Sequence, residues 1–309
     1  MIRRLSLLLA ALALTSELYA STCTTLGADT ATSNGTAVVG GLDAKGSWVQ
    51  FTASSGHVSK LIYLFFSKQP SDATSFLIDI GTGGAGSETV ILPNLVIDNN
   101  TTSLAGVFGP LYVNIATSTR IAVRAEADGT AGGDETIFVT LLICDEAIPE
   151  LTSYTYATYG AISGATPKAT SIDPGGTANT KGSYTQLVAT AQSSIEQMWL
   201  EFGINNNNAT TTASWLVDVA IGSGGSETVV LSNLFISVHS TTDFSLPFSL
   251  LVPGDSYAGQ RIAVRAQCTI IDATDRLLTV TALTAAGTVV SGGGGGGLRI
   301  AGPGGLVAR

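Results

Sequence analysis

An internal duplication limits the possible folds of this chain more than any other feature of its sequence. Four blocks recur in the same order, at offsets that grow slowly from 133 to 141 residues. The block Arg120–Ala125 returns letter for letter as Arg261–Ala266. A tandem duplication followed by small loop insertions produces this pattern, so we predict two domains with the same fold. The other three repeated pairs are 25–28 with 158–161, 45–50 with 181–186, and 86–97 with 225–236.

The repeats divide the chain into modules and connecting segments. We expect a first module at 24–144 and a second at 157–284, each about the size of one β-sandwich. Residues 145–156 suit an extended connector, and residues 1–23 form a separate N-terminal segment. The tail, 285–309, contains six consecutive glycines and is predicted to act as a flexible tether that ends in a C-terminal arm.

The composition of both modules favours an all-β fold. Only 12% of the residues are charged, the mean hydropathy is +0.36, and the apolar runs are short and bounded by Gly, Asn, Asp and Ser. About eight short strands in each module favour two packed antiparallel sheets, with jelly-roll-like connections preferred over an immunoglobulin-like order. The expected strands are 47–52, 61–66, 76–80, 89–97, 111–115, 121–125 and 137–143, then 184–189, 198–204, 215–220, 229–236, 248–252, 262–266 and 277–283.

Alternation along these strands separates core residues from outward-facing ones. Phe76, Ile78 and Ile80 share one side, predicted to be the core, whereas Leu77 and Asp79 lie on the other. The same pattern recurs in the second copy, where Trp215, Val217 and Val219 oppose Leu216 and Asp218. Arg120 and Arg124 also alternate outward, so a cross-strand pair between aspartate and arginine is expected.

Several charged residues occur in both copies and could be read as a site made of carboxylates and arginines. We favour a structural role, because a duplicated enzyme usually loses its chemistry from one copy, whereas residues kept in both more often serve folding or module packing. The repeated pairs are Asp79 and Asp218, Glu88 and Glu227, Arg120 and Arg261, and Arg124 and Arg265.

Little in the sequence supports catalysis or a bound cofactor. The chain has two histidines, His57 and His239, which lie in polar loops and do not correspond between the copies. We therefore expect no enzyme, no catalytic or metal site and no cofactor. The glycine-rich stretches 83–86 and 222–225 are predicted hairpin turns rather than phosphate-binding loops, and 205–208 is a predicted loop tip without the carboxylates of a calcium site.

Exposed aromatic residues could instead bind a glycan. Trp48 with Tyr184, and Tyr156 with Tyr159, are the candidates. The first pair alternates like core residues, which argues against that role for it.

Charge, cysteines and the N-terminus constrain partners and location. A net charge of −9 argues against nucleic acid, which needs clustered lysine and arginine. Three cysteines are too few and too scattered to predict a disulfide framework. Arg3 and Arg4 precede the apolar run 5–14, which indicates either a secretory signal peptide or an apolar arm that docks on a partner. The run is too short to span a membrane as a helix.

Four blocks of the second copy resemble a module of structural proteins from tailed bacteriophages: Lys181–Tyr184, Trp215–Val219, Gly224–Val229 and Arg261–Ala266. The resemblance covers roughly residues 24 to 284. It implies a virion surface protein, such as a decoration, fibre or tail-accessory protein, whose partners are capsid or tail proteins and other copies of itself. A host-surface glycan is a further possible partner. The alternatives are a secreted bacterial adhesin or glycan-binding protein and, third, a secreted hydrolase.

Overall fold

The computed structural model is all-β, as predicted. It describes residues 22–28, 35–68, 75–97, 104–128, 135–145, 151–165, 167–204, 213–238, 248–253, 255–270 and 278–289. The leader segment 1–20, His239, the loop tip 205–208 and the glycine tether lie outside the described residues. One short 3-10 helix, Asp255–Tyr257, is the only helical element of the described residues.

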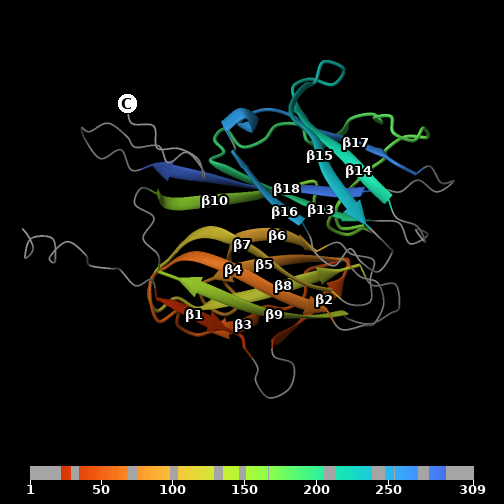
Figure 1. The fold of residues 1–309 in the computed structure, drawn as a ribbon. Helices are drawn as coiled ribbons and strands as arrows, with labels where there is room; N and C mark the ends of the chain where they lie inside the picture. Colours follow the sequence, from red (N-terminus) through yellow and green to blue (C-terminus); the bar gives the residue numbers. More distant parts are fainter. Residues whose placement is uncertain are drawn as a thin grey trace, which may run out of the picture.

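The first module consists of nine strands in one sheet that curls almost into a barrel (Figure 1). Its order is β6-β5-β8-β2-β9-β4-β7, with β1 beside β9 and β3 beside β8. The short strand β2 joins the two halves, because it pairs in parallel with β8 and antiparallel with β9. The strands are β1 (Cys23–Leu26), β2 (Thr36–Leu42), β3 (Val49–Thr52), β4 (Ser59–Lys68), β5 (Phe76–Thr82), β6 (Thr89–Ile97), β7 (Leu104–Ile115), β8 (Ile121–Ala127) and β9 (Glu135–Cys144).

The second module repeats these pairings except that of β2 with β8, because β11 pairs only with β18, and so it has two separate sheets. One has the order β10-β18-β13-β16, with β11 beside β18, and the other has the order β12-β17-β14-β15. The first of these orders matches β1-β9-β4-β7 of the first module, and the second matches β3-β8-β5-β6. The strands are β10 (Leu151–Tyr159), β11 (Thr170–Ile172), β12 (Thr185–Val188), β13 (Gln197–Ile204), β14 (Ala213–Ile221), β15 (Thr228–Val238), β16 (Phe248–Pro253), β17 (Ile262–Cys268) and β18 (Leu278–Val289).

Alternating apolar residues build each core, as the sequence predicts. Phe76, Ile78 and Ile80 are fully buried in the core of the first module. The second core receives Trp215, Val217 and Val219 from one sheet and Met198, Leu200, Phe202, Leu278, Val280 and Ala282 from the other. Both sheets of the second module therefore enclose a common core.

The glycine-rich stretches form the predicted hairpin turns. Gly83 and Gly86 adopt φ angles of 113° and 79° between the paired strands β5 and β6. Gly222 and Gly225 do the same between β14 and β15, with φ angles of 101° and 85°. Glycine suits these positions because positive φ is strained for residues with a side chain.

Three details differ from the sequence-based expectations. Residues 151–156 of the expected connector belong to β10, which pairs with β18, and β18 itself continues to Val289, past the expected boundary at 284. The entry to each module supplies two strands, β1 with β2 and β10 with β11, whereas the expected total of about eight strands leaves room for one beyond the seven expected ranges. Cys23 and Cys144, for which the sequence predicts no particular pairing, form a disulfide between β1 and β9, whereas Cys268 is buried in the second module.

The second module rests on the first through one of its sheets. Figure 1 shows β10, β13, β16 and β18 as the layer nearest to β6 and β7, with β14, β15 and β17 on the far side of the second module. Strand β10 contacts both β6 and β7.

Candidate functional site

The first part of the candidate site is an ionic cluster around Asp79, on the outer side of β5. Its carboxylate accepts hydrogen bonds from Lys45 Nζ at 2.9 Å, Arg124 Nε at 2.9 Å and the backbone N–H of Asn94 at 2.8 Å. The Arg124 guanidinium lies 4.5 Å from the centre of the Trp48 ring, within the range of a cation–π interaction. Asp79 and Arg124 are direct cross-strand partners, which confirms the predicted pair.

The second module builds the same cluster from the corresponding residues. Asp218 accepts hydrogen bonds from Lys181 Nζ at 2.8 Å, Arg265 Nε at 3.0 Å and the backbone N–H of Asn233 at 2.9 Å. Arg265 lies 4.6 Å from the centre of the Tyr184 ring. Burial opposes ionisation of Asp218, but the hydrogen bonds from Lys181, Asn233 and Arg265 outweigh it and hold the pKa of this carboxyl below its usual value.

The other repeated residues tie each hairpin turn to a neighbouring strand. Arg120 donates to Glu88 at 2.7 Å, to Gln50 on β3 at 2.9 Å and to the carbonyl of Gly83 at 3.3 Å. Its counterpart Arg261 makes the same three contacts, with Glu227, Gln186 and the carbonyl of Gly222. All eight charged residues predicted to correspond between the copies therefore occupy equivalent ion pairs.

Sequence reasoning missed three members of each cluster. Lys45 and Asn94 lie in repeated blocks but far from Asp79 in sequence, and their convergence depends on the tertiary fold. Trp48 and Tyr184 were expected to be core residues, and this was wrong. They are partly exposed because they lie on the outer side of the sheet, where they cover the arginines.

The clusters hold their polar groups in ion pairs and hydrogen bonds. His57 is partly exposed in the first module and contacts Thr24 and the carbonyl of Val58. Within the described part of the chain, no three histidine, cysteine, aspartate or glutamate side chains converge as metal ligands. What the arrangement does is fix the segment 45–48 and its counterpart against the outer side of their sheets.

The second part of the candidate site is the interface between the modules. Leu77 on β5 and Val96 on β6 pack against Ala169 of the second module. Thr158 on β10 donates to the carbonyl of Pro93, and Tyr156 donates to the carbonyl of Tyr112 at 2.7 Å. Trp199, Leu283 and Ala285 extend the core of the first module across this interface.

A buried ion pair closes one end of the interface. Lys168 of the second module is fully buried and contacts Glu126 at 2.8 Å and Asp43 at 2.7 Å, both in the first module. Glu126 also accepts hydrogen bonds from Ser163 and from the backbone N–H of Gly164. Although burial opposes its ionisation, the hydrogen bonds from Lys168, Gly164 and Ser163 keep the pKa of Glu126 below its usual value.

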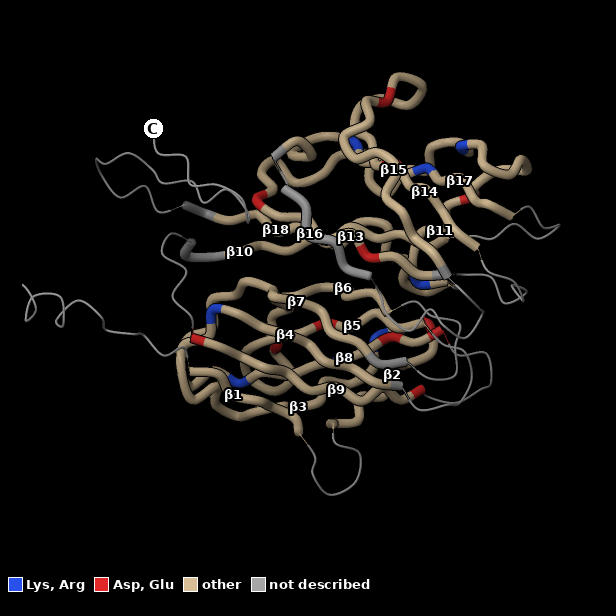
Figure 2. The backbone as a smooth tube through the Cα atoms, in the orientation of Figure 1, with Lys and Arg blue, Asp and Glu red and all other residues tan. Residues whose placement is uncertain are grey.

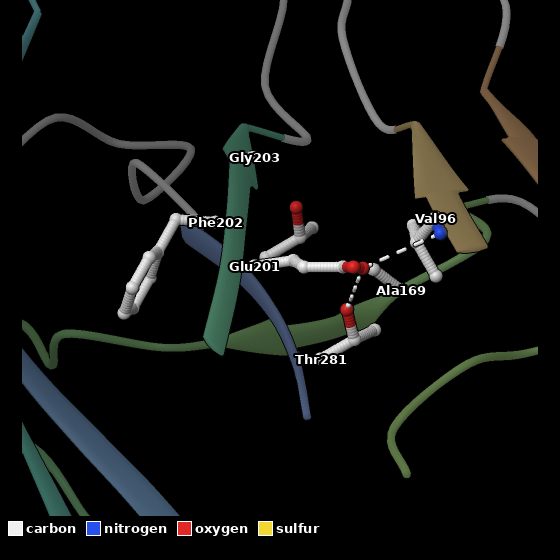
Figure 3. A pocket seen from close by; sticks show the side chains of 7 residues that line it. Val96, Ala169, Glu201, Phe202, Gly203 and Thr281 are labelled. Carbon is white, nitrogen blue, oxygen red and sulfur yellow. Dashed lines mark hydrogen bonds between the residues drawn. The ribbon is translucent and has the colours of Figure 1, made fainter. Parts of the chain in front are cut away.

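Glu201 lies within the same interface. Figure 3 shows it reaching from β13 toward Val96, with Thr281 beside it. One carboxyl oxygen accepts hydrogen bonds from the Val96 N–H at 3.3 Å and the Thr281 hydroxyl at 3.0 Å. The other oxygen has no hydrogen-bond partner among the described residues. Burial raises the pKa of Glu201 to about 8. The carboxyl borders a cavity of about 10 Å³, space for about one water molecule, lined by Val96, Ala169, Glu201, Phe202, Gly203, Thr279 and Thr281.

Comparisons with known proteins give only distant likenesses. No protein-family model and no curated protein matches the sequence. PNGF-II matches with a TM-score of 0.38 and 9% identity, over 86% of this chain, which spans 65% of the PNGF-II chain. The tandem CBM22 domains of Paenibacillus barcinonensis Xyn10C match with a TM-score of 0.24 and 9% identity, over 87% of this chain and 92% of that one. A chain of Sulfolobus Turreted Icosahedral Virus matches with a TM-score of 0.23 and 12% identity, over 84% of this chain and 61% of that one. At these scores the matches assign neither a family nor a function.

The described residues also bear on membrane insertion. None of them forms a helix with the length and apolar character needed to cross a bilayer.

Proposed function

We propose that this chain is a structural protein on the surface of a bacteriophage particle, as a decoration, fibre or tail-accessory protein that works through the packing of its modules. One observation carries the proposal: both copies keep the same ion pairs. The four contacts to Asp79 and Arg124 recur at Asp218 and Arg265 with nearly equal distances. Residues that make identical contacts in both copies stabilise the module itself. A module that packs against neighbouring proteins needs a rigid outer surface.

The strand orders support a jelly-roll-like fold for both modules. When β2 and β11 are set aside, the remaining eight strands of each module pair as 1-8-3-6 and 2-7-4-5 in chain order. Two antiparallel Greek keys wound in this way make a jelly roll, an architecture common in capsid proteins and lectins. The module interface adds to the proposal, since it is largely apolar and closed by a buried ion pair.

Immunogold labelling of intact particles tests this function. Antibodies against the purified protein are expected to decorate phage particles from lysates of cells that carry its gene. Labelling confined to material that sediments apart from particles would contradict the proposal. Antibodies against a cytosolic host protein serve as the control for debris attached to the particles.

A secreted adhesin or glycan-binding protein is the second candidate, and the disulfide favours it. Cys23 and Cys144 are joined in the structure, and structural disulfides persist chiefly in oxidising environments outside the cytosol. An export signal at residues 1–20 would provide that environment. Mass spectrometry of the mature N-terminus separates the candidates, since cleavage after Ala20 supports export and an intact Met1 contradicts it.

A further inference from the structure

The contact between the two modules uses a surface that the duplication has copied. On the first module this surface, the acceptor face, is centred on Leu77 of β5 and Val96 of β6. The second module carries it again at Leu216 and Phe235. The pairing registers establish the match, because Leu77 lies opposite Val96 and Glu126, as Leu216 lies opposite Phe235 and Gln267.

The opposite surface of the contact is copied as well. On the second module this donor face contains Trp199 and Glu201 of β13, which pair with Leu283 and Thr281 of β18. In the first module, Tyr63 and Phe65 of β4 pair with Leu142 and Thr140 of β9 in the same register. Phe65 is therefore the structural counterpart of Glu201, and Tyr63 is the counterpart of Trp199.

Within one chain, only one of the two copies of each face is buried in a contact between modules. The acceptor face of the first module is covered by the second module, and Val96 is 3% exposed. Its counterpart Phe235 is 67% exposed. The donor residue Glu201 is 3% exposed, whereas its counterpart Phe65 is 42% exposed. Each chain thus presents a free donor face on its first module and a free acceptor face on its second. In Figure 1, β14 and β15 lie on the side of the second module that faces away from the first.

We propose that these two free faces bind each other in different copies of the chain, so that the protein associates head to tail. The first module of one copy docks on the second module of the next, as the two modules dock within a chain. In the internal contact, Glu201 reaches the backbone of Val96. The same superposition in the new contact brings Phe65 to Phe235, which would bury two exposed aromatic side chains against each other.

The charges of the acceptor faces agree with this assignment. The internal acceptor face carries Asp43 and Glu126, which the buried ammonium of Lys168 neutralises. In the free acceptor face the equivalent residues are the neutral amides Asn179 and Gln267. Asn179 shares with Asp43 both a positive φ and a backbone hydrogen bond to the neighbouring strand. The free face therefore needs no buried lysine from its partner. Figure 2 shows how few charged residues lie along the strands of either module.

This contact joins unlike surfaces, so it can repeat from copy to copy and form rings or filaments. The biological meaning of this contact rests on the proposed function. The partner is a second copy of the chain, and copies on the particle would associate through the free donor and acceptor faces.

Sedimentation velocity of the full chain tests the proposal. We expect concentration-dependent association of the wild-type protein between about 1 µM and about 1 mM. Phe65→Asp or Phe235→Asp should weaken association by at least about thirty-fold, because each places a charge at the centre of the contact. Both side chains are exposed, so the monomer should fold as the wild type does, and circular dichroism verifies this. Val90→Asp changes a valine that is 37% exposed outside the free faces and serves as the matched control.

Mixing the two variants gives the decisive result. A Phe65→Asp chain keeps its acceptor face and a Phe235→Asp chain keeps its donor face, so the mixture should form a one-to-one dimer that grows no further. A wild-type chain that stays monomeric, variants that associate as the wild type does, or a mixture that stays monomeric would each overturn the proposal. Particle labelling is independent of this result: labelled particles with a monomeric chain would remove the self-docking proposal and leave the proposed function.

Discussion

Replacing the buried carboxyl of Glu201 by an amide should change how the stability of the protein depends on pH. Burial raises the pKa of Glu201 to about 8, from an ordinary value of 4.5. The folded state therefore keeps this proton between those pH values, whereas the unfolded state loses it. Protonation stabilises the folded state fully below about pH 4.5, and this stability is lost progressively as the pH rises toward 8.

The size of the effect follows from the shift. About 1.4 kcal/mol per pKa unit gives roughly 5 kcal/mol over the whole window. In Glu201→Gln the side-chain oxygen can still accept hydrogen bonds from the Val96 N–H and the Thr281 hydroxyl, and the amide has no proton to lose. Between about pH 5 and about pH 8, the wild-type free energy of unfolding should fall by several kcal/mol more than that of the variant.

Urea unfolding at a series of pH values measures this difference, with tryptophan fluorescence as the signal because Trp199 lies in the interface beside Glu201. Glu196→Gln removes an exposed carboxyl from the same segment and is the control, expected to keep the wild-type slope. Parallel stability curves for the wild type and Glu201→Gln would refute the reasoning, because they would mean that Glu201 titrates alike in the folded and unfolded states.

Three further predictions concern the repeated cluster, the ion pair and the disulfide. A Cβ added at Gly81 would lie 2.6 Å from Cη2 of Trp48, so Gly81→Ala should lower the free energy of unfolding by about 1–3 kcal/mol. Adding Trp48→Tyr should restore part of the lost stability, because the second module has Tyr184 and Ala220 at the positions of Trp48 and Gly81. A double-mutant cycle in urea measures the coupling between the two substitutions. Lys168→Met leaves Glu126 buried without its ammonium partner and should cost about 3–5 kcal/mol, and adding Glu126→Gln should recover part of that loss in thermal unfolding. The disulfide closes a sequence separation of 121 residues, so replacing both Cys23 and Cys144 by alanine should lower the free energy of unfolding by about 4 kcal/mol. If the wild-type protein has the same free energy of unfolding with and without reductant, this last expectation is contradicted.

Much of the fold could be predicted from residues close together in the sequence. Side chains alternate across a strand with a period of two, so this alternation by itself assigns the buried positions of β5 and β14 and the outward positions of Asp79 and Asp218. The repeated blocks identified the two modules and eight of the ten charged residues in the repeated ion pairs, all except Lys45 and Lys181. The predicted cross-strand pair of an aspartate and an arginine needed only the assumption that their strands are neighbours, and the register shows that it joins Asp79 to Arg124.

Contacts between distant segments could not be predicted in this way. Strand alternation does not say which loop crosses a sheet, so Lys45, Asn94 and Trp48 were not assigned to Asp79. It does not say which outer face meets another module. The roles of Glu201, Lys168 and Glu126 were therefore missed, because these residues lie up to 125 positions from their partners. Local pattern determines which side of a strand a residue occupies, because that depends on backbone geometry alone. Which surfaces and cysteines meet depends on the path of the whole chain, and only the tertiary structure reveals it.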